Sequence, residues 1–242
     1  ENGEDIIRAL TAEGADVNTP TARGWTEKMW TPLMIAAMNS NKNSVSIIQA
    51  LIEAGAKINE CDKNGDTPIM IAIQHDGEQT EENIRALINA GADVNKQNYY
   101  RFTSLILIAK YRYESIYALS TMKLLINAGA NVNMCDKQGF TPLMIIVSNG
   151  GKNTEEMIIA LTDAGANVNA TSIDGQTPLM WAVQHDDKYA FGIVELLINL
   201  GADINKQADD GSKAIDFTRL DSMVELILDN PIPNPGTGIG FS

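Results

Sequence analysis

The chain has few of the side chains that most often build catalytic or metal sites. Among its 242 residues are two cysteines, Cys61 and Cys135, and two histidines, His75 and His185. Two cysteines are too few for a disulfide framework, so the fold must be held by packing. Long apolar runs are also absent: the stretch Leu105–Ala109 falls far short of the ~20 residues that a membrane-spanning helix needs. We therefore expect no membrane partner.

Basic residues are scarce relative to acidic ones. The chain carries 18 lysines and arginines against 31 aspartates and glutamates, a formal net charge of −13 at pH 7. This charge repels a phosphate backbone, so we expect no nucleic acid partner. Aromatic residues make up only 6% of the chain, whereas 44% of its residues are hydrophobic. That hydrophobic content is enough for a sizeable buried core and argues against disorder.

The two ends of the chain carry weaker signals. Residues 231–242 contain three prolines and three glycines, a composition that predicts an extended tail after one domain over residues 1–230. The sequence begins at Glu1 rather than at methionine. Two locations therefore stay open: the cytoplasm, or the periplasm or cell exterior if a signal peptide preceded Glu1.

A five-residue phrase, Gly-Ala-x-(Val/Ile)-Asn, recurs along the chain. The successive copies are 41, 36, 38, 36 and 36 residues apart. A period of this size indicates a repeat protein, in which each repeat buries its apolar face against its neighbours. The copies begin at Gly14, Gly55, Gly91, Gly129, Gly165 and Gly201.

A second phrase, Thr-Pro-(Leu/Ile)-Met, keeps the same register. A threonine followed by proline predicts a helix start, because the hydroxyl can accept a hydrogen bond from an unpaired amide and proline lacks a donor that would have no partner. A glycine after an apolar run predicts a helix end, because glycine adopts the left-handed conformation without steric penalty. The phrase begins at Thr31, Thr67, Thr141 and Thr177, with a degraded copy at Thr103.

Together the two phrases predict a helical hairpin in each repeat. In the second repeat, for example, we expect one helix over about Pro68–His75 and another over about Thr80–Ala90, with a turn around Gly77. Seven residues separate the last asparagine of the phrase from the next threonine at four junctions, which predicts a hairpin-like finger. The first finger, between Asn18 and Thr31, has 12 residues and is enlarged.

A finger, a Thr-Pro-Leu helix, a second helix and the phrase Gly-Ala-Asp-Val-Asn together resemble the ankyrin repeat, over roughly residues 5–229. The resemblance implies an all-α solenoid of stacked helical hairpins with β-hairpin-like fingers, here five full helical pairs between partial repeats. The family's Thr-Pro-Leu-His has become Thr-Pro-(Leu/Ile)-Met, so methionine packing is expected to replace the histidine hydrogen bonds. The methionines are Met34, Met70, Met144 and Met180.

The repeat register disperses the residues that could do chemistry. His75 and His185 are equivalent positions three repeats apart, which predicts a separation of roughly 25–30 Å. Cys61 and Cys135 are also equivalent and two repeats apart, so we expect two free thiols. Glycine-rich phosphate loops are absent from the sequence. We therefore expect no enzyme, with no catalytic residue, no bound metal and no cofactor.

In the ankyrin pattern, the fingers and the ends of the first helices form a concave groove in which partners bind. Large side chains gather at those positions in this chain, and the third finger is the richest because Tyr99–Phe102 replaces the family's usual turn. Exposed aromatics beside an arginine are typical of interface hot spots, although Phe102 and Phe140 are also candidates for packing of one finger on the next. The predicted partner-binding residues are Trp25, Trp30, Tyr99, Tyr100, Arg101, Phe102, Tyr111, Phe140, Ile173 and His185.

We therefore expect a monomeric, noncatalytic scaffold that binds another protein through this groove. Because the chain is acidic, the partner is expected to present a basic rim around an apolar centre. Two alternatives stay open, since fold alone does not fix function. One is a regulatory or protective subunit of an enzyme, which a secretion signal upstream of Glu1 would favour. The other is the scaffold part of a larger enzyme, which a further domain in the full-length gene would favour.

Overall fold

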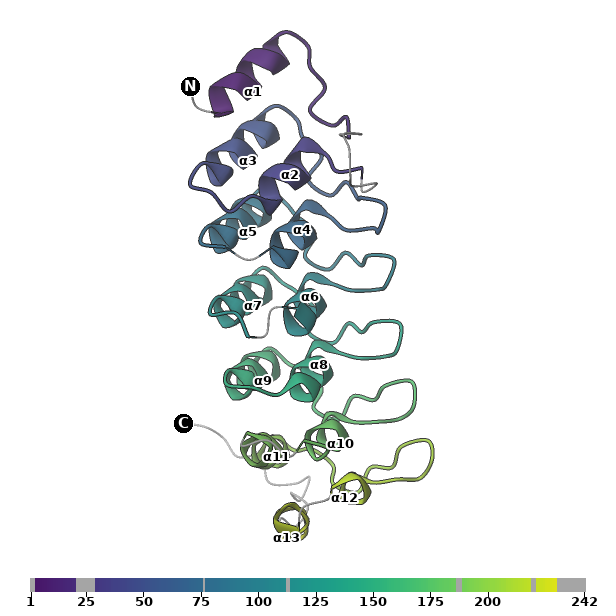
Figure 1. Cartoon of the computed structure of the whole chain (residues 1–242). Helices are drawn as coiled ribbons and strands as arrows, with labels where there is room; N and C mark the ends of the chain where they lie inside the picture. Colours follow the sequence, from purple (N-terminus) through teal and green to yellow (C-terminus); the bar gives the residue numbers. More distant parts are fainter. Residues whose placement is uncertain are drawn as a thin grey trace. The chain divides into compact units, whose positions relative to one another are not determined.

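The computed structural model describes residues 3–20, 29–75, 77–111, 114–185, 189–218 and 221–229. These residues form α-helices joined by turns and fingers, and none of them forms a strand (Figure 1). The predicted all-α class is confirmed. Packing divides the chain into two compact units, residues 1–137 and residues 138–242. A single domain over residues 1–230 stays a prediction, and the tail over residues 231–242 lies outside the described residues.

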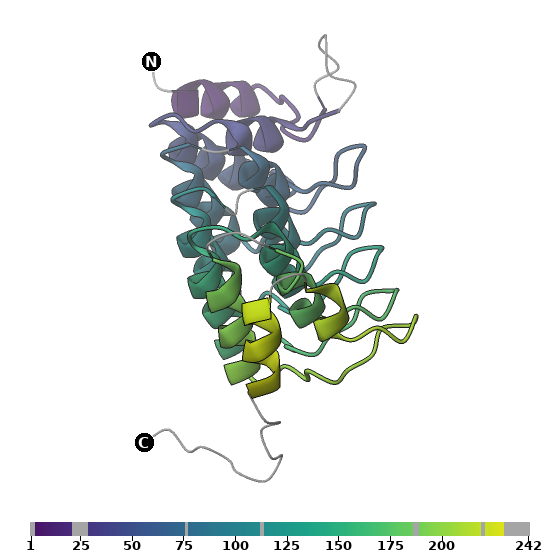
Figure 2. The ribbon, with the colours of Figure 1, turned by 60° about the horizontal axis from the view of Figure 1, so that its bottom comes forward.

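The described residues of the first unit form helices in two layers (Figures 1 and 2). The helix that follows each finger is called the inner helix here, and the next one the outer helix. Inner helices α2, α4 and α6 contact one another in order, as do outer helices α1, α3, α5 and α7. The bounds are α1 (Gly3–Ala12), α2 (Pro32–Met38), α3 (Ser44–Glu53), α4 (Pro68–Gln74), α5 (Thr80–Asn89), α6 (Ser104–Tyr111) and α7 (Ala118–Asn127).

The second unit repeats the same hairpin. Inner helices α8, α10 and α12 contact one another in order, and the outer helices α9 and α11 are neighbours. Helix α12 has only four residues, at the repeat where Lys213 stands in place of the usual threonine. The bounds are α8 (Pro142–Asn149), α9 (Thr154–Asp163), α10 (Pro178–Ala182), α11 (Ala190–Asn199), α12 (Ala214–Phe217) and α13 (Asp221–Asp229).

The predicted helix starts are confirmed at all five threonines. Except at Thr67, the threonine hydroxyl accepts a hydrogen bond from the backbone N–H three residues later, at 3.3 Å. The four methionines of the phrase are buried in the core, as predicted. The sulfur atoms of Met34 and Met180 also accept a hydrogen bond from the N–H of Thr31 and Thr177, at 3.4 Å. The methionines therefore both fill the core and help to start helices.

The glycine and the asparagine of the recurring phrase have separate roles. The six glycines end outer helices with φ between 85° and 92°, as predicted. The asparagine links one repeat to the next: the Asn95 amide donates to the Gly129 carbonyl at 3.0 Å and accepts from the Asn131 N–H at 2.7 Å. Asn59 and Asn169 make the same pair of bonds. Neighbouring repeats are thus joined by a polar ladder as well as by apolar packing.

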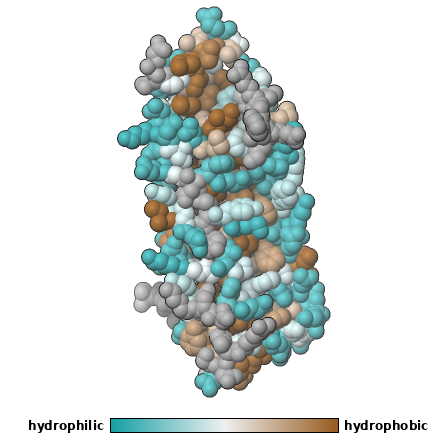
Figure 3. Space-filling view, viewed as in Figure 1, coloured by the Kyte–Doolittle hydropathy of each residue, from teal (hydrophilic) through white to brown (hydrophobic). Residues whose placement is uncertain are grey.

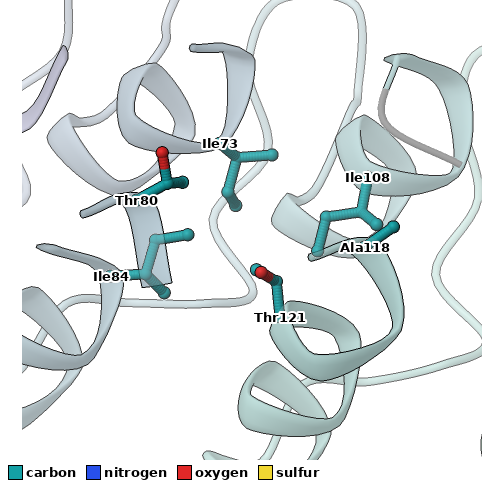
Figure 4. A pocket seen from close by; sticks show the side chains of 6 residues that line it. All are labelled: Ile73, Thr80, Ile84, Ile108, Ala118 and Thr121. Carbon is teal, nitrogen blue, oxygen red and sulfur yellow. The ribbon is translucent and has the colours of Figure 1, made fainter. Parts of the chain in front are cut away.

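Aliphatic side chains fill the space between the layers. Figure 4 shows a gap between the second and third repeats, which leaves no space for a water molecule. The hydroxyl of Thr121 is buried there without a hydrogen-bond partner among the described residues. No small molecule fits into this gap. It is lined by Ile73, Thr80, Ile84, Ile108, Ala118 and Thr121.

Candidate functional site

The third finger and helix α6 bring four aromatic side chains together on the first unit. Tyr99, Tyr100 and Tyr111 are exposed, with 66%, 55% and 57% of their surface accessible, and Phe102 is half-buried. The rings of Tyr100 and Phe102 stack with centroids 5.7 Å apart. These four residues are called the aromatic cluster here. The stacked pair joins two residues of the third finger, and Tyr111 is the last residue of inner helix α6.

Cationic side chains lie on the faces of these rings. The Lys110 ammonium is 5.5 Å from the centroid of Phe102 and 5.9 Å from that of Tyr111. The Lys137 ammonium is 5.9 Å from the centroid of Tyr100. Cation–π contacts of this kind orient rings that would otherwise be mobile on the surface. Neither lysine was predicted from the sequence, although Lys137 shares its register with Tyr99 and Lys110 precedes Tyr111.

Hydrogen bonds at the base of the third finger fix the backbone that carries the rings. The side-chain oxygen of Asn98 accepts hydrogen bonds from the N–H groups of Tyr100 and Phe102 at 3.0 and 2.9 Å. The Asn98 amide also donates to the buried carboxylate of Asp66 at 2.7 Å. Burial raises the pKa of the Tyr111 phenol, and the nearby Asp66 and Tyr100 raise it further. The phenol therefore stays protonated at neutral pH and can donate a hydrogen bond.

Arg101 stands at the tip of this finger with φ 62°, in the left-handed region. Glycine fills the equivalent position in the other described fingers, with φ between 75° and 85°, at Gly65, Gly139, Gly175 and Gly211. Glycine also permits the next finger to approach closely, because a Cβ on Gly65 would lie only 2.9 Å from the backbone nitrogen of Tyr99. That nitrogen donates to the Asn64 carbonyl at 2.9 Å. The corresponding bond from Lys137 to the Tyr100 carbonyl is absent among the described residues, which we attribute to the Cβ of Arg101.

The two predicted tryptophans do not join the cluster. Trp30 is only 9% exposed and packs with Met34 and Ile71 in the core. Its indole N–H donates to the Asp62 carboxylate at 3.0 Å, and its ring meets His75 edge-on at 6.0 Å. A ring held in this way has a structural role, so the predicted contact with a partner is not carried forward. Trp25 lies outside the described residues.

The remaining predicted contacts lie in the second unit. Ile173 is 63% exposed at the fifth finger. Phe140 is half-buried, and its ring lies 5.2 Å from that of Trp181 in a tilted arrangement. This contact packs Phe140 against inner helix α10 of the next repeat, which differs from the expected packing of one finger on the next. His185 is half-buried.

The structure also places His75 and the two cysteines among the described residues. His75 accepts or donates through Nδ1 to the Ile71 carbonyl at 2.9 Å. Cys61 and Cys135 are free, as predicted, and half-buried. Across the part of the chain that the structure describes, no group of three histidine, cysteine or acidic residues could hold a metal ion. No helix in that part is long and apolar enough to span a membrane.

One apolar groove of about 260 Å³ lies at the α1 end of the first unit. Figure 3 shows apolar side chains gathered at this end. Ile35 is 36% exposed there, whereas Ile71, its equivalent one repeat later, is 1% exposed because α2 packs on α4. The groove therefore corresponds to the face that the preceding inner helix covers elsewhere. It is lined by Ile7, Pro32, Ile35, Ala36, Asn39, Ser44, Ile47 and Leu51.

Comparisons with known proteins agree with this geometry. A family model described as ankyrin repeats (3 copies) matches residues 1–98 and 105–208. The ankyrin repeat domain of Bcl-3, a member of the IkappaB protein family, is 23% identical with a TM-score of 0.75, over 93% of this chain and 91% of that one. The human ASB11 ankyrin repeat domain is 21% identical with a TM-score of 0.71, over 96% and 94%. No curated protein matches the chain. At these identities the two structures show the fold alone.

Proposed function

The chain belongs to the ankyrin repeat family, and we propose that it is a noncatalytic scaffold that binds another protein through the aromatic cluster of its third repeat. Ankyrin repeat domains are typically protein-interaction modules, which supports the general class. The cluster supports the location, because Tyr99, Tyr100 and Tyr111 expose more than half of their surface. In the second unit, Ile173 and His185 stay proposed contacts in their own right.

The single observation that carries this proposal is the gathering of large exposed rings at the third finger. Aromatic side chains surrounded by water contribute little to the stability of the free chain, and contiguous exposed apolar surface lowers solubility. Tyrosine and arginine are the residues that contribute most to protein interfaces when a partner buries them. Arg101 adds to this, because it occupies a position where glycine would be less strained.

The test begins with capture of a partner by the immobilised chain, followed by identification by mass spectrometry. Replacing Tyr99→Ala and Tyr100→Ala together should then weaken binding by about 2 kcal/mol or more, with little change in melting temperature. Phe191→Ala is the matched control, because Phe191 is a 44% exposed ring on outer helix α11 and should leave binding unchanged. A double variant that melts several degrees lower and binds normally would mean that the tyrosines pack the finger and do not contact a partner.

A further inference from the structure

We propose that the aromatic cluster binds an acidic segment of a polypeptide, an inference that rests on the proposed function. Carboxylates of the segment would pair with Lys110, Lys137 and Arg101. An apolar side chain of the same segment would pack on the exposed tyrosine rings. The inference thus names the chemistry of the partner at a surface already argued to be an interface.

The three cations beside the rings are available to a ligand. Arg101, Lys110 and Lys137 are all exposed. Their charged groups form no ion pair with any residue that the structure describes. Lys110 and Lys137 already sit over ring faces, so their ammonium groups are held at the surface with free donors. Positioned, unneutralised cations of this kind recognise carboxylates through charge-assisted hydrogen bonds.

The carboxylate of Asp66, near the rings, is buried and hydrogen-bonded within the finger. Asp66 lies near enough to the cluster to raise the pKa of Tyr111, and it is only 5% exposed. Both of its oxygens accept hydrogen bonds, from the Asn98 amide at 2.7 Å and from the Gln74 amide at 3.0 Å. Its charge is therefore directed into the base of the finger. Asp66 therefore leaves the exposed cations of the cluster without an ion pair among the described residues.

The charge at the cluster has the opposite sign from the net charge of the whole chain. Three exposed basic residues, Arg101, Lys110 and Lys137, lie at the cluster, whereas the whole chain has 18 basic and 31 acidic residues. A basic rim on the partner was expected because the net charge of the whole chain is negative. Charges within a Debye length of about 8 Å determine contact energies at physiological salt, so the local excess of basic residues leads to the opposite expectation at this surface.

Rings flanked by cations also occur in proteins that bind single-stranded nucleic acid. A long polyanion would, however, meet the negative charge of the remaining chain, with its formal total of −13. A short acidic segment carries few charges and can be confined to the cluster. The observations therefore favour the peptide, and nucleic acid is one of the outcomes that the experiment separates.

The experiment selects peptides from a random phage-displayed library on the immobilised full chain, after depletion on the Tyr99→Ala, Tyr100→Ala variant. Only peptides that depend on the cluster survive this depletion. We expect them to contain several aspartates or glutamates close to a large apolar residue. Synthetic versions should bind at least about tenfold more weakly to a Lys110→Gln, Lys137→Gln variant. The matched control, Lys42→Gln with Lys123→Gln, removes two exposed lysines elsewhere on the first unit and should bind normally.

Each other outcome overturns the inference in a distinguishable way. Cluster-dependent peptides that are basic or uncharged would leave the proposed function standing and refute the acidic segment. Binding of an oligothymidylate that is lost in the tyrosine double variant would replace the peptide with nucleic acid. A selection that yields no cluster-dependent peptide would count against the proposed function itself. A Lys110→Arg, Lys137→Arg variant keeps both positive charges and should keep the affinity, and a loss of affinity would refute recognition of carboxylates by charge at these positions.

Discussion

Arg101 keeps a left-handed backbone conformation, with φ 62°, that glycine keeps in the other described fingers. A residue with a Cβ in this region is less stable by about 1 kcal/mol or more than one in an ordinary conformation. Since its side chain is exposed, little packing offsets this strain. Within the proposed function, the strained position is retained because it presents the guanidinium group of Arg101 to the partner.

Replacing Arg101→Gly should therefore separate stability from binding. We expect the free energy of unfolding to rise by about 0.5–1 kcal/mol, because relief of strain exceeds the added chain entropy of glycine. Affinity for a cluster-dependent acidic peptide should fall. Urea denaturation followed by circular dichroism measures the first effect, and titration calorimetry measures the second. Lower stability together with unchanged affinity would show that Arg101 serves the finger rather than a partner.

Thr121 is a second residue whose side chain does not suit its position. Its buried hydroxyl has no hydrogen-bond partner among the described residues, and the equivalent residues of α3 and α11 are Ile47 and Ile193. Because an unpaired buried hydroxyl is destabilising, Thr121→Val should raise the free energy of unfolding by about 1 kcal/mol. Thr80→Val is the control in the same gap. The Thr80 hydroxyl donates to the His75 carbonyl at 3.0 Å, so this variant should be less stable than the wild type.

At the scale of elements, the asparagine ladder joins neighbouring hairpins within each unit. Asn95→Ala removes two hydrogen bonds to the following repeat and leaves the Gly129 carbonyl and the Asn131 N–H to water. We expect a loss of about 1–2 kcal/mol in thermal or urea unfolding. Asn89→Ala, at an exposed helix end, should change stability far less. Equal effects of the two substitutions would mean that the ladder contributes little.

The glycines that end outer helices make a cleaner test of backbone conformation. Gly91 has φ 92°, and a Cβ at this position would meet no atom within 4 Å. Any penalty therefore comes from the backbone and not from a clash. Gly91→Val should lower the free energy of unfolding by about 1 kcal/mol or more, whereas Gly91→Asn should be tolerated better, since asparagine visits the left-handed region more readily. Similar losses for both would point to a packing role for this glycine.

These local rules explain how far the sequence predicts the elements. Thr67-Pro68 and Gly91 act through the few residues around them, so the helix starts and ends were predictable from their order along the chain. The burial of Trp30 was not predictable in this way, because it depends on Asp62 and His75 from the following repeat. Lys110 and Lys137 were missed for the same reason. Their contacts join residues at different positions of the repeat, which a search for recurring phrases does not compare.

At the scale of the whole molecule, the excess of acidic over basic residues differs between the two units. The first unit has 13 basic and 17 acidic residues, and the second has five and 14. The three cations of the cluster therefore lie in the less acidic of the two units. An acidic peptide would be repelled at long range and attracted at short range. Its affinity should depend on salt through the contact with the three cations rather than through the net charge.

The net charge of −13 also predicts how copies of the chain behave toward one another. At pH 7 mutual repulsion should keep them apart, so light scattering after size exclusion should give a mass near 26.2 kDa. As the pH falls toward the isoelectric point near 4.5, carboxylates take up protons and the repulsion is lost, so scattering should rise. Asp16 and Asp210 should keep their charge to lower pH than most, because backbone N–H groups of Asn18 and Ser212 lower their pKa values. A dimer at pH 7 that persists in high salt would contradict this prediction and would indicate a specific interface between copies.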